Sequence, residues 1–137
     1  MNLFLCVSKG GGRLFNHRRQ AFDPVQIENM VTYAGAPLWV NGFSHKLLSK
    51  YTDHPLVLSS SPLEEAGAGA WVFVEDLPLA PYMDRVETLV IYHWNVKYPT
   101  DTMLDIDPRE AGFRRFQVVE FAGVAHKKIT REVWVRK

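Results

Sequence analysis

Two short segments of this chain each place a histidine directly before a lysine. His45 precedes Lys46 in one segment, and His126 begins the run that ends at Lys128 in the other. Two imidazoles beside cations are what cleavage of an RNA phosphodiester requires. One imidazole takes the 2′-hydroxyl proton, the other protonates the leaving oxygen, and a cation stabilises the charged intermediate. The pattern predicts His45 and His126 as the catalytic acid/base pair, with Thr130 orienting the reacting group.

Basic and amide side chains near the N-terminus have the chemistry of phosphate recognition. Three glycines precede Arg13, and backbone N–H groups of such a loop can turn towards an anion. Guanidinium groups bind phosphate through paired hydrogen bonds. The predicted substrate-binding set is Arg13, Asn16, Arg18, Arg19, Lys46 and Lys128. The structural alternatives are a mobile glycine loop, a solvated basic loop, and a helix cap at Ser44 that leaves His45 on the surface.

Other reactive side chains have simpler interpretations. One cysteine and five dispersed histidines match no zinc-site spacing, so we predict neither a metal nor an organic cofactor. His93, at the end of a predicted strand, is interpreted as a core or edge residue. Asp101, Asp105 and Asp107 match no calcium loop and are interpreted as a solvated acidic segment. The lone Cys6 lies in an apolar run and is expected in the core.

Charge is distributed unevenly along the chain. Residues 1–50 carry a net charge of +4, residues 51–107 carry −8, and residues 108–137 carry +5. If the two basic ends are neighbours in space, they form a basic face that attracts polyanions. The alternative is that acidic and basic groups interleave and cancel.

The elements that must position these residues are short. The clearest helix runs from Pro24 to Ala34, with Asp23 as its N-cap, an apolar stripe along one side, and Gly35 as its stop. Shorter helices are predicted at residues 44–51 and after Ser61. Strands are predicted at residues 2–8, 38–40, 56–58, 70–74, 86–94, 113–121 and 129–136, with residues 86–94 central in the sheet. Residues 77–81 are predicted as a connector, and residues 95–112 as a long irregular segment.

Fold class follows from this order of elements and from composition. The chain of 137 residues is 47% hydrophobic and 23% charged, which is typical of a folded domain. We predict one α+β domain spanning residues 1–137, built on a mostly antiparallel sheet with a few short helices. No apolar run reaches the length of a membrane span, and no secretory leader is evident. The expected location is cytoplasmic.

These observations favour a small, metal-independent phosphodiesterase-like or RNA-cleaving protein. A second hypothesis is a non-catalytic module that binds a nucleotide, nucleic acid or partner protein through a basic face. A third is an accessory protein whose acidic middle segment docks on a basic partner. A short distance between His45 and His126 in the folded protein would favour the first hypothesis.

Overall fold

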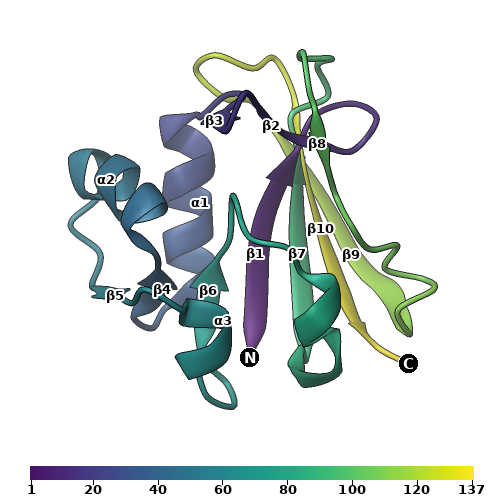
Figure 1. The fold of residues 1–137 in the computed structure, drawn as a ribbon. Helices are drawn as coiled ribbons and strands as arrows, with labels where there is room; N and C mark the ends of the chain where they lie inside the picture. Colours follow the sequence, from purple (N-terminus) through teal and green to yellow (C-terminus); the bar gives the residue numbers. More distant parts are fainter.

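The fold is built on a seven-stranded mixed sheet (Figure 1). The computed structural model describes residues 1–137. The strands run in the order β5-β4-β6-β1-β7-β10-β9. Their bounds are β1 (Asn2–Val7), β4 (Leu38–Val40), β5 (Leu56–Leu58), β6 (Trp71–Phe73), β7 (Thr88–His93), β9 (Phe113–Phe121) and β10 (Ile129–Arg136).

Strand β1 lies in the middle of this sheet. It pairs in parallel with β6 on one side and with β7 on the other. A strand covered on both faces has no polar side to show to water, and its sequence reads as a continuous apolar run. That is why Leu3, Phe4 and Leu5 are all fully buried.

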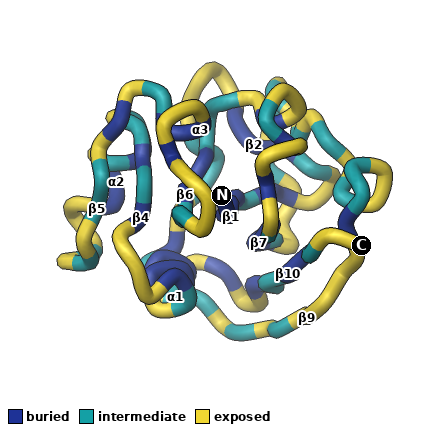
Figure 2. The backbone as a smooth tube through the Cα atoms, turned by 90° about the horizontal axis from the view of Figure 1, so that it is seen from below, coloured by how far each residue is buried: buried dark blue, intermediate teal, exposed yellow.

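Helices cover both faces of the sheet. The helices are α1 (Pro24–Ala34), α2 (Gly42–Tyr51), the short α3 (Pro62–Glu65) and the 3-10 helix η1 (Ala80–Arg85). One apolar core packs α1 and α2 against one sheet face, and a second core packs α3 and η1 against the other. The view from below shows α1 and α3 on opposite sides of β1, with β9 exposed along its length at the edge (Figure 2).

Helix α1 confirms the sequence prediction at both ends. Asp23 accepts a hydrogen bond from the Val25 N–H at 3.0 Å, and Gly35 closes the helix in the left-handed conformation with φ of 62°. A residue with a Cβ is strained at that angle, so glycine suits the position. Gln26 does not complete a capping box. Its amide instead lies buried beside the Met30 sulfur.

A second, three-stranded sheet lies over the carboxyl end of β1. It consists of β3, β2 and β8 in that order, with bounds β2 (Gly12–Phe15), β3 (Arg18–Arg19) and β8 (Thr102–Met103). The turn between β2 and β3 holds Asn16 and His17 at positive φ, as two-residue hairpin turns require. These strands were not predicted, because two to four residues carry too little periodicity to be recognised.

The prediction of a mostly antiparallel sheet is wrong. Four of the strand pairs are parallel (β5 with β4, β4 with β6, β6 with β1, and β1 with β7), and only β10 and β9 join in antiparallel fashion. The architecture is therefore a single α/β domain. The connections between parallel strands are short helices, α3 having four residues, so the sequence lacked the long helical segments that usually indicate such a sheet.

Strand β7 was predicted as central and is interior, one place from the middle. Residues Leu89 to Tyr92 are buried on both faces. Its outer neighbour β10 pairs with it in antiparallel fashion, and β9 beyond β10 forms an edge of the sheet. None of the helices combines the length and apolar character that crossing a membrane requires.

Because β1 is central in the sheet, we expect a large loss of stability when one of its buried side chains is truncated. Phe4 is fully buried and stacks on Trp71 with ring centroids 4.7 Å apart. We expect Phe4→Ala to lower the free energy of unfolding by about 3–5 kcal/mol, measured by urea denaturation. The control is Phe116→Ala on β9, where the ring is 61% exposed and the expected cost is below about 0.5 kcal/mol. Equal costs for the two variants would contradict this packing.

Candidate functional site

The carboxyl ends of β1, β4 and β6 meet at one edge of the main sheet. The chain leaves β1 for β4 through α1 on one face, and leaves β6 for β7 through η1 on the other face. In open α/β sheets, a crevice where ligands bind opens at the point where neighbouring connections pass to opposite faces of the sheet. The segment from residue 8 to residue 23, which includes β2 and β3, covers this edge at the top of Figure 1.

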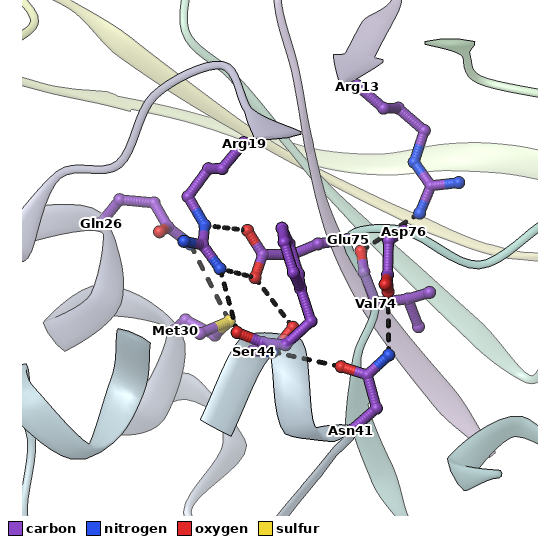
Figure 3. A network of polar contacts seen from close by, with 10 residues as sticks. Arg13, Arg19, Gln26, Met30, Asn41, Ser44, Val74, Glu75 and Asp76 are labelled. Atoms are coloured by element: carbon purple, nitrogen blue, oxygen red, sulfur yellow. Dashed lines mark hydrogen bonds and ion pairs between the residues drawn. The ribbon is translucent and has the colours of Figure 1, made fainter. Parts of the chain in front are cut away.

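An ion pair occupies the middle of this edge (Figure 3). Two guanidinium nitrogens of Arg19 donate to the Glu75 carboxylate, with Nε at 2.5 Å from one oxygen and Nη2 at 2.6 Å from the other. The side chains are only 21% and 10% exposed. Arg19 also donates to the Phe43 carbonyl and lies 4.6 Å over the Phe43 ring. The guanidinium is therefore committed to the protein and is not free for a ligand.

The start of α2 is tied to the same carboxylates. Ser44 donates its hydroxyl to Glu75 at 2.8 Å, and the Asn41 amide donates to Asp76 at 2.8 Å. Asn41 is also the N-cap, because its side-chain oxygen accepts from the Ser44 N–H. The predicted cap at Ser44 is thus replaced by one three residues earlier, and the serine hydroxyl serves the buried carboxylate instead.

Arg13 points into the protein. Its guanidinium donates to the carbonyls of Leu77 and Val74 at 2.7 and 3.3 Å, and the residue is only 6% exposed. Burial lowers the pKa of Arg13, while the charges of Asp105, Asp76 and Glu75 act in the opposite direction. The side chain joins β2 to the segment after β6, which is a structural role in place of the predicted phosphate contact.

A pocket of about 600 Å³ opens between Phe22 and helix α2. The rings of Phe22 and Tyr51 are in contact, with centroids 5.0 Å apart. Lys46 and Lys50, one helical turn apart, line the same pocket. The remaining lining residues are Arg19, Gly42, Phe43 and Leu47. Aromatic surface and two cationic side chains with no acidic partner thus face one space.

His126 lies in a closed polar cluster, where it is 3% exposed. Its Nδ1 is 2.9 Å from Asp23, its Nε2 is 2.9 Å from the Tyr98 hydroxyl, and its ring stacks on Trp94 at 4.4 Å. Asp23 also accepts from the backbone N–H groups of Val124 and Ala125. Histidine, carboxylate and tyrosine together fasten residues 122–128 to the start of α1.

Burial alone would raise the pKa of Asp23. The hydrogen bonds from His126 and from the N–H groups of Val124, Ala125 and Val25 outweigh burial and lower it. Asp23 therefore stays ionised at neutral pH and contributes to stability in that form.

Of the other predicted site residues, Arg19 lines a pocket of about 410 Å³ together with His126. His45 lies in the first turn of α2 and does not line that pocket. Thr130 accepts from Asn95, and Lys128 pairs with Glu120 at 3.4 Å. The remaining two predicted residues, Asn16 and Arg18, lie at the β2–β3 hairpin. Arg18 is exposed, and the Asn16 N–H donates to the Asp101 carboxylate.

Sequence reasoning missed Glu75, Asp76 and Asn41. Acidic residues after a strand are ordinarily solvated, so their type gave no indication of burial. Their position was informative, however, since Glu75 and Asp76 directly follow the strongly predicted strand at residues 70–74. Side chains at such a strand end lie at the edge where ligands bind if the sheet is parallel.

Comparison with known proteins defines the fold. No protein-family model matches the chain, and no curated protein matches it in sequence. Among solved structures, the chain is similar to dihydrofolate reductase from Enterococcus faecalis in complex with NADP(H) and RAB-propyl. The TM-score is 0.69, sequence identity is 8%, and the match covers 99% of this chain and 95% of that one. The fold is that of dihydrofolate reductase.

The hypothesis of a phosphodiesterase-like or RNA-cleaving protein is wrong. The fold is one seen in a reductase, and His126, its intended acid or base, is enclosed by Asp23, Tyr98 and Trp94. The related expectation of nucleic-acid binding through a basic face is also unsupported. Arg13 and Arg19 are bonded within the protein, and Lys128 is paired with Glu120.

NADP(H), which the comparison reductase binds, does not fit the edge of the main sheet where the carboxyl ends of β1, β4 and β6 meet. A dinucleotide phosphate needs free N–H groups at a helix N-terminus. Here the Ser44 N–H is taken by Asn41, and two carboxylates lie beside it. Arg19 neutralises Glu75, but Asp76 has only the neutral Asn41 amide. A ligand phosphate placed about 4 Å from the Asp76 carboxylate would be repelled by about 4 kcal/mol at an effective dielectric constant of 20.

The buried Asp23 cluster predicts a pH-dependent loss of stability. We expect Asp23→Asn to lower the free energy of unfolding by about 2–3 kcal/mol at pH 7, because the amide cannot accept all four donors. A carboxyl with a lowered pKa stabilises the fold above its unfolded pKa and loses that effect as pH falls through the folded pKa. Thermal denaturation should therefore show the two proteins converging below about pH 3.9.

The control for this comparison is Asp53→Asn, which changes an exposed carboxyl. It should leave stability within about 0.5 kcal/mol of the wild type. A constant difference between wild type and Asp23→Asn down to low pH would show that the Asp23 charge does not matter.

Proposed function

We propose that this protein binds a small, aromatic, negatively charged molecule in the pocket between Phe22 and α2, and that dihydrofolate is the compound class to test first. The observation that carries the proposal is the pairing of aromatic and cationic side chains in that pocket. Dihydrofolate has heteroaromatic and benzoyl rings joined to a glutamate, and it is the substrate that the name of the comparison enzyme gives.

The sequence of α2 places the pocket residues on one side of the helix. Phe43, Lys46, Leu47 and Lys50 follow the spacing i, i+3, i+4 and i+7, which lines one helical face. Leu47 is buried at the base, and both lysines are exposed. A ligand ring placed against Phe22 and Tyr51 therefore has ammonium groups within one helical turn.

The pocket has the size and chemistry of a small-molecule site. Its volume of about 600 Å³ lies inside the range of about 300–1,000 Å³ that is usual for such sites. Aromatic faces supply apolar contact area, and each lysine adds a charge-assisted hydrogen bond to a carboxylate. A ligand without a negative charge leaves both lysines without a partner.

The proposal is for binding and not for NADP(H)-dependent reduction. The edge beside the pocket holds Glu75 and Asp76 in place of anion-binding donors. No step of the comparison enzyme's reaction is assigned to this chain. The supported function is that of a ligand-binding protein with the dihydrofolate reductase fold.

Dihydrofolate binding can be measured by isothermal titration calorimetry. We expect saturable binding to the wild type and a loss of about tenfold in affinity for Lys46→Ala or Lys50→Ala, equivalent to about 1.4 kcal/mol. Tyr51→Ala should lose a similar amount because it removes ring contact. The matched control is Lys97→Ala, which removes an exposed lysine outside the pocket and should bind as the wild type does. Absence of binding, or equal loss in the control, contradicts the proposal.

NADPH provides a second titration with the opposite expectation. We expect no saturable binding of NADPH to the wild type at concentrations up to about 1 mM, which corresponds to an affinity weaker than about −4 kcal/mol. The reason is the carboxylate pair at the edge of the sheet. Micromolar binding of NADPH would show that Glu75 and Asp76 are displaced in solution.

A further inference from the structure

Another cleft lies on the opposite face of the sheet from this pocket. Its volume is about 630 Å³. Its floor contains Val7, Ile91 and Trp134, which belong to the core that packs against α3 and η1. The loop after β1 and the segment at residues 103–109 form its walls. Like the first pocket, it opens near the carboxyl ends of a parallel pair, here β1 and β7.

A histidine–carboxylate pair lines this cleft. The Nε2 of His93 is 2.5 Å from one carboxylate oxygen of Glu132, and the other oxygen accepts from Arg115 at 3.1 Å. Strands β7 and β10 set this geometry. Glu132 pairs with Ile91, two residues before His93, so His93 and Glu132 are diagonal neighbours on the same sheet face. Nδ1 of His93 makes no hydrogen bond within the protein, and the side chain is 33% exposed.

Glu132 is held as an anion. The hydrogen bond from His93 lowers its pKa most, burial acts in the opposite direction, and Arg115 and Trp134 add further hydrogen bonds, giving a pKa of about 2. Nε2 of His93 therefore faces a fixed carboxylate, and Nδ1 has no hydrogen-bond partner in the protein.

Cations flank the histidine at the walls of the cleft. Arg109 lies 5.0 Å over the Trp134 ring, and Lys9 is exposed on the loop after β1 with no acidic partner. Asp107 is the other acidic residue of the cleft, and its side chain accepts from the Arg109 N–H. The charges of Arg109 and Lys9 are thus available above an apolar floor.

We propose that this cleft is a second ligand site, which binds a small organic acid through His93, Arg109 and Lys9. The acid's apolar body lies on Ile91 and Trp134. Its carboxylate accepts hydrogen bonds from the cationic side chains of Arg109 and Lys9, and His93 lines the same cleft beside them. Glu132 is a positioning residue that fixes the orientation of the His93 ring. The site is independent of the dihydrofolate proposal, because its lining residues belong to the other face of the sheet.

Benzoate and its neutral isostere benzamide test the charge requirement on ¹⁵N-labelled protein by NMR. We expect benzoate to shift the amide signals of Gly10, Gly11, residues 104–107 and Arg109, and the ring signals of His93. Benzamide should bind at least about tenfold more weakly, since it lacks the charge. Shifts confined to α2, or equal affinity for the two compounds, would overturn the proposal.

Two variants locate the charges that matter. Lys9→Ala changes an exposed loop residue and should weaken benzoate binding about threefold to tenfold, and His93→Gln should do the same by removing the ring that lines the cleft beside the bound acid. The control is Arg114→Ala, which removes a positive charge next to Arg115 from the other sheet face, since Arg114 pairs with Val135. Unchanged binding in Lys9→Ala and His93→Gln, or an equal loss in Arg114→Ala, would refute the site.

Discussion

The Arg19–Glu75 ion pair is the constraint on which the carboxyl edge of the sheet depends. A carboxylate as enclosed as Glu75 is costly without partners, and here it receives the Arg19 guanidinium and the Ser44 hydroxyl. These contacts hold β3 against the end of β6, and they hold the first turn of α2 close to both strands. Phe43 is fixed by the same guanidinium. The pocket beside Phe22 takes its shape from this arrangement.

A second buried carboxylate performs a similar task at the start of α1. Asp23 caps the helix and also holds the loop before β10 through His126 and two backbone N–H groups. One side chain thus joins elements that are about a hundred residues apart in the chain. Both carboxylates are satisfied internally, and neither is offered to a ligand.

Part of the uneven charge along the sequence is neutralised between the basic first segment and the acidic middle segment. Arg19 from the basic first segment pairs with Glu75 from the acidic middle. Arg13 approaches the same carboxylates and bonds to carbonyls. The cations that remain without partners are the ones on exposed surfaces, such as Lys46 and Lys50 on α2 and Lys9 after β1. They face small pockets on opposite sides of the sheet, which favours small anions over an extended polyanion.

The sequence alone determined the local elements, and the tertiary structure decided what they build. Asp23, Pro24 and Gly35 fix α1 because caps and turn stops act between neighbouring residues. The buried runs at residues 2–8 and 86–94 gave strands because apolar, β-branched stretches fit a sheet covered on both faces. Parallel pairing, in contrast, depends on which strands meet, and three-residue strands with a four-residue crossover helix carry no pattern for it. The burial of His126, Arg13 and Glu75 also depends on partners that are distant in sequence, which include Asp23 for His126, Leu77 for Arg13 and Arg19 for Glu75. It could therefore be known only from the folded chain.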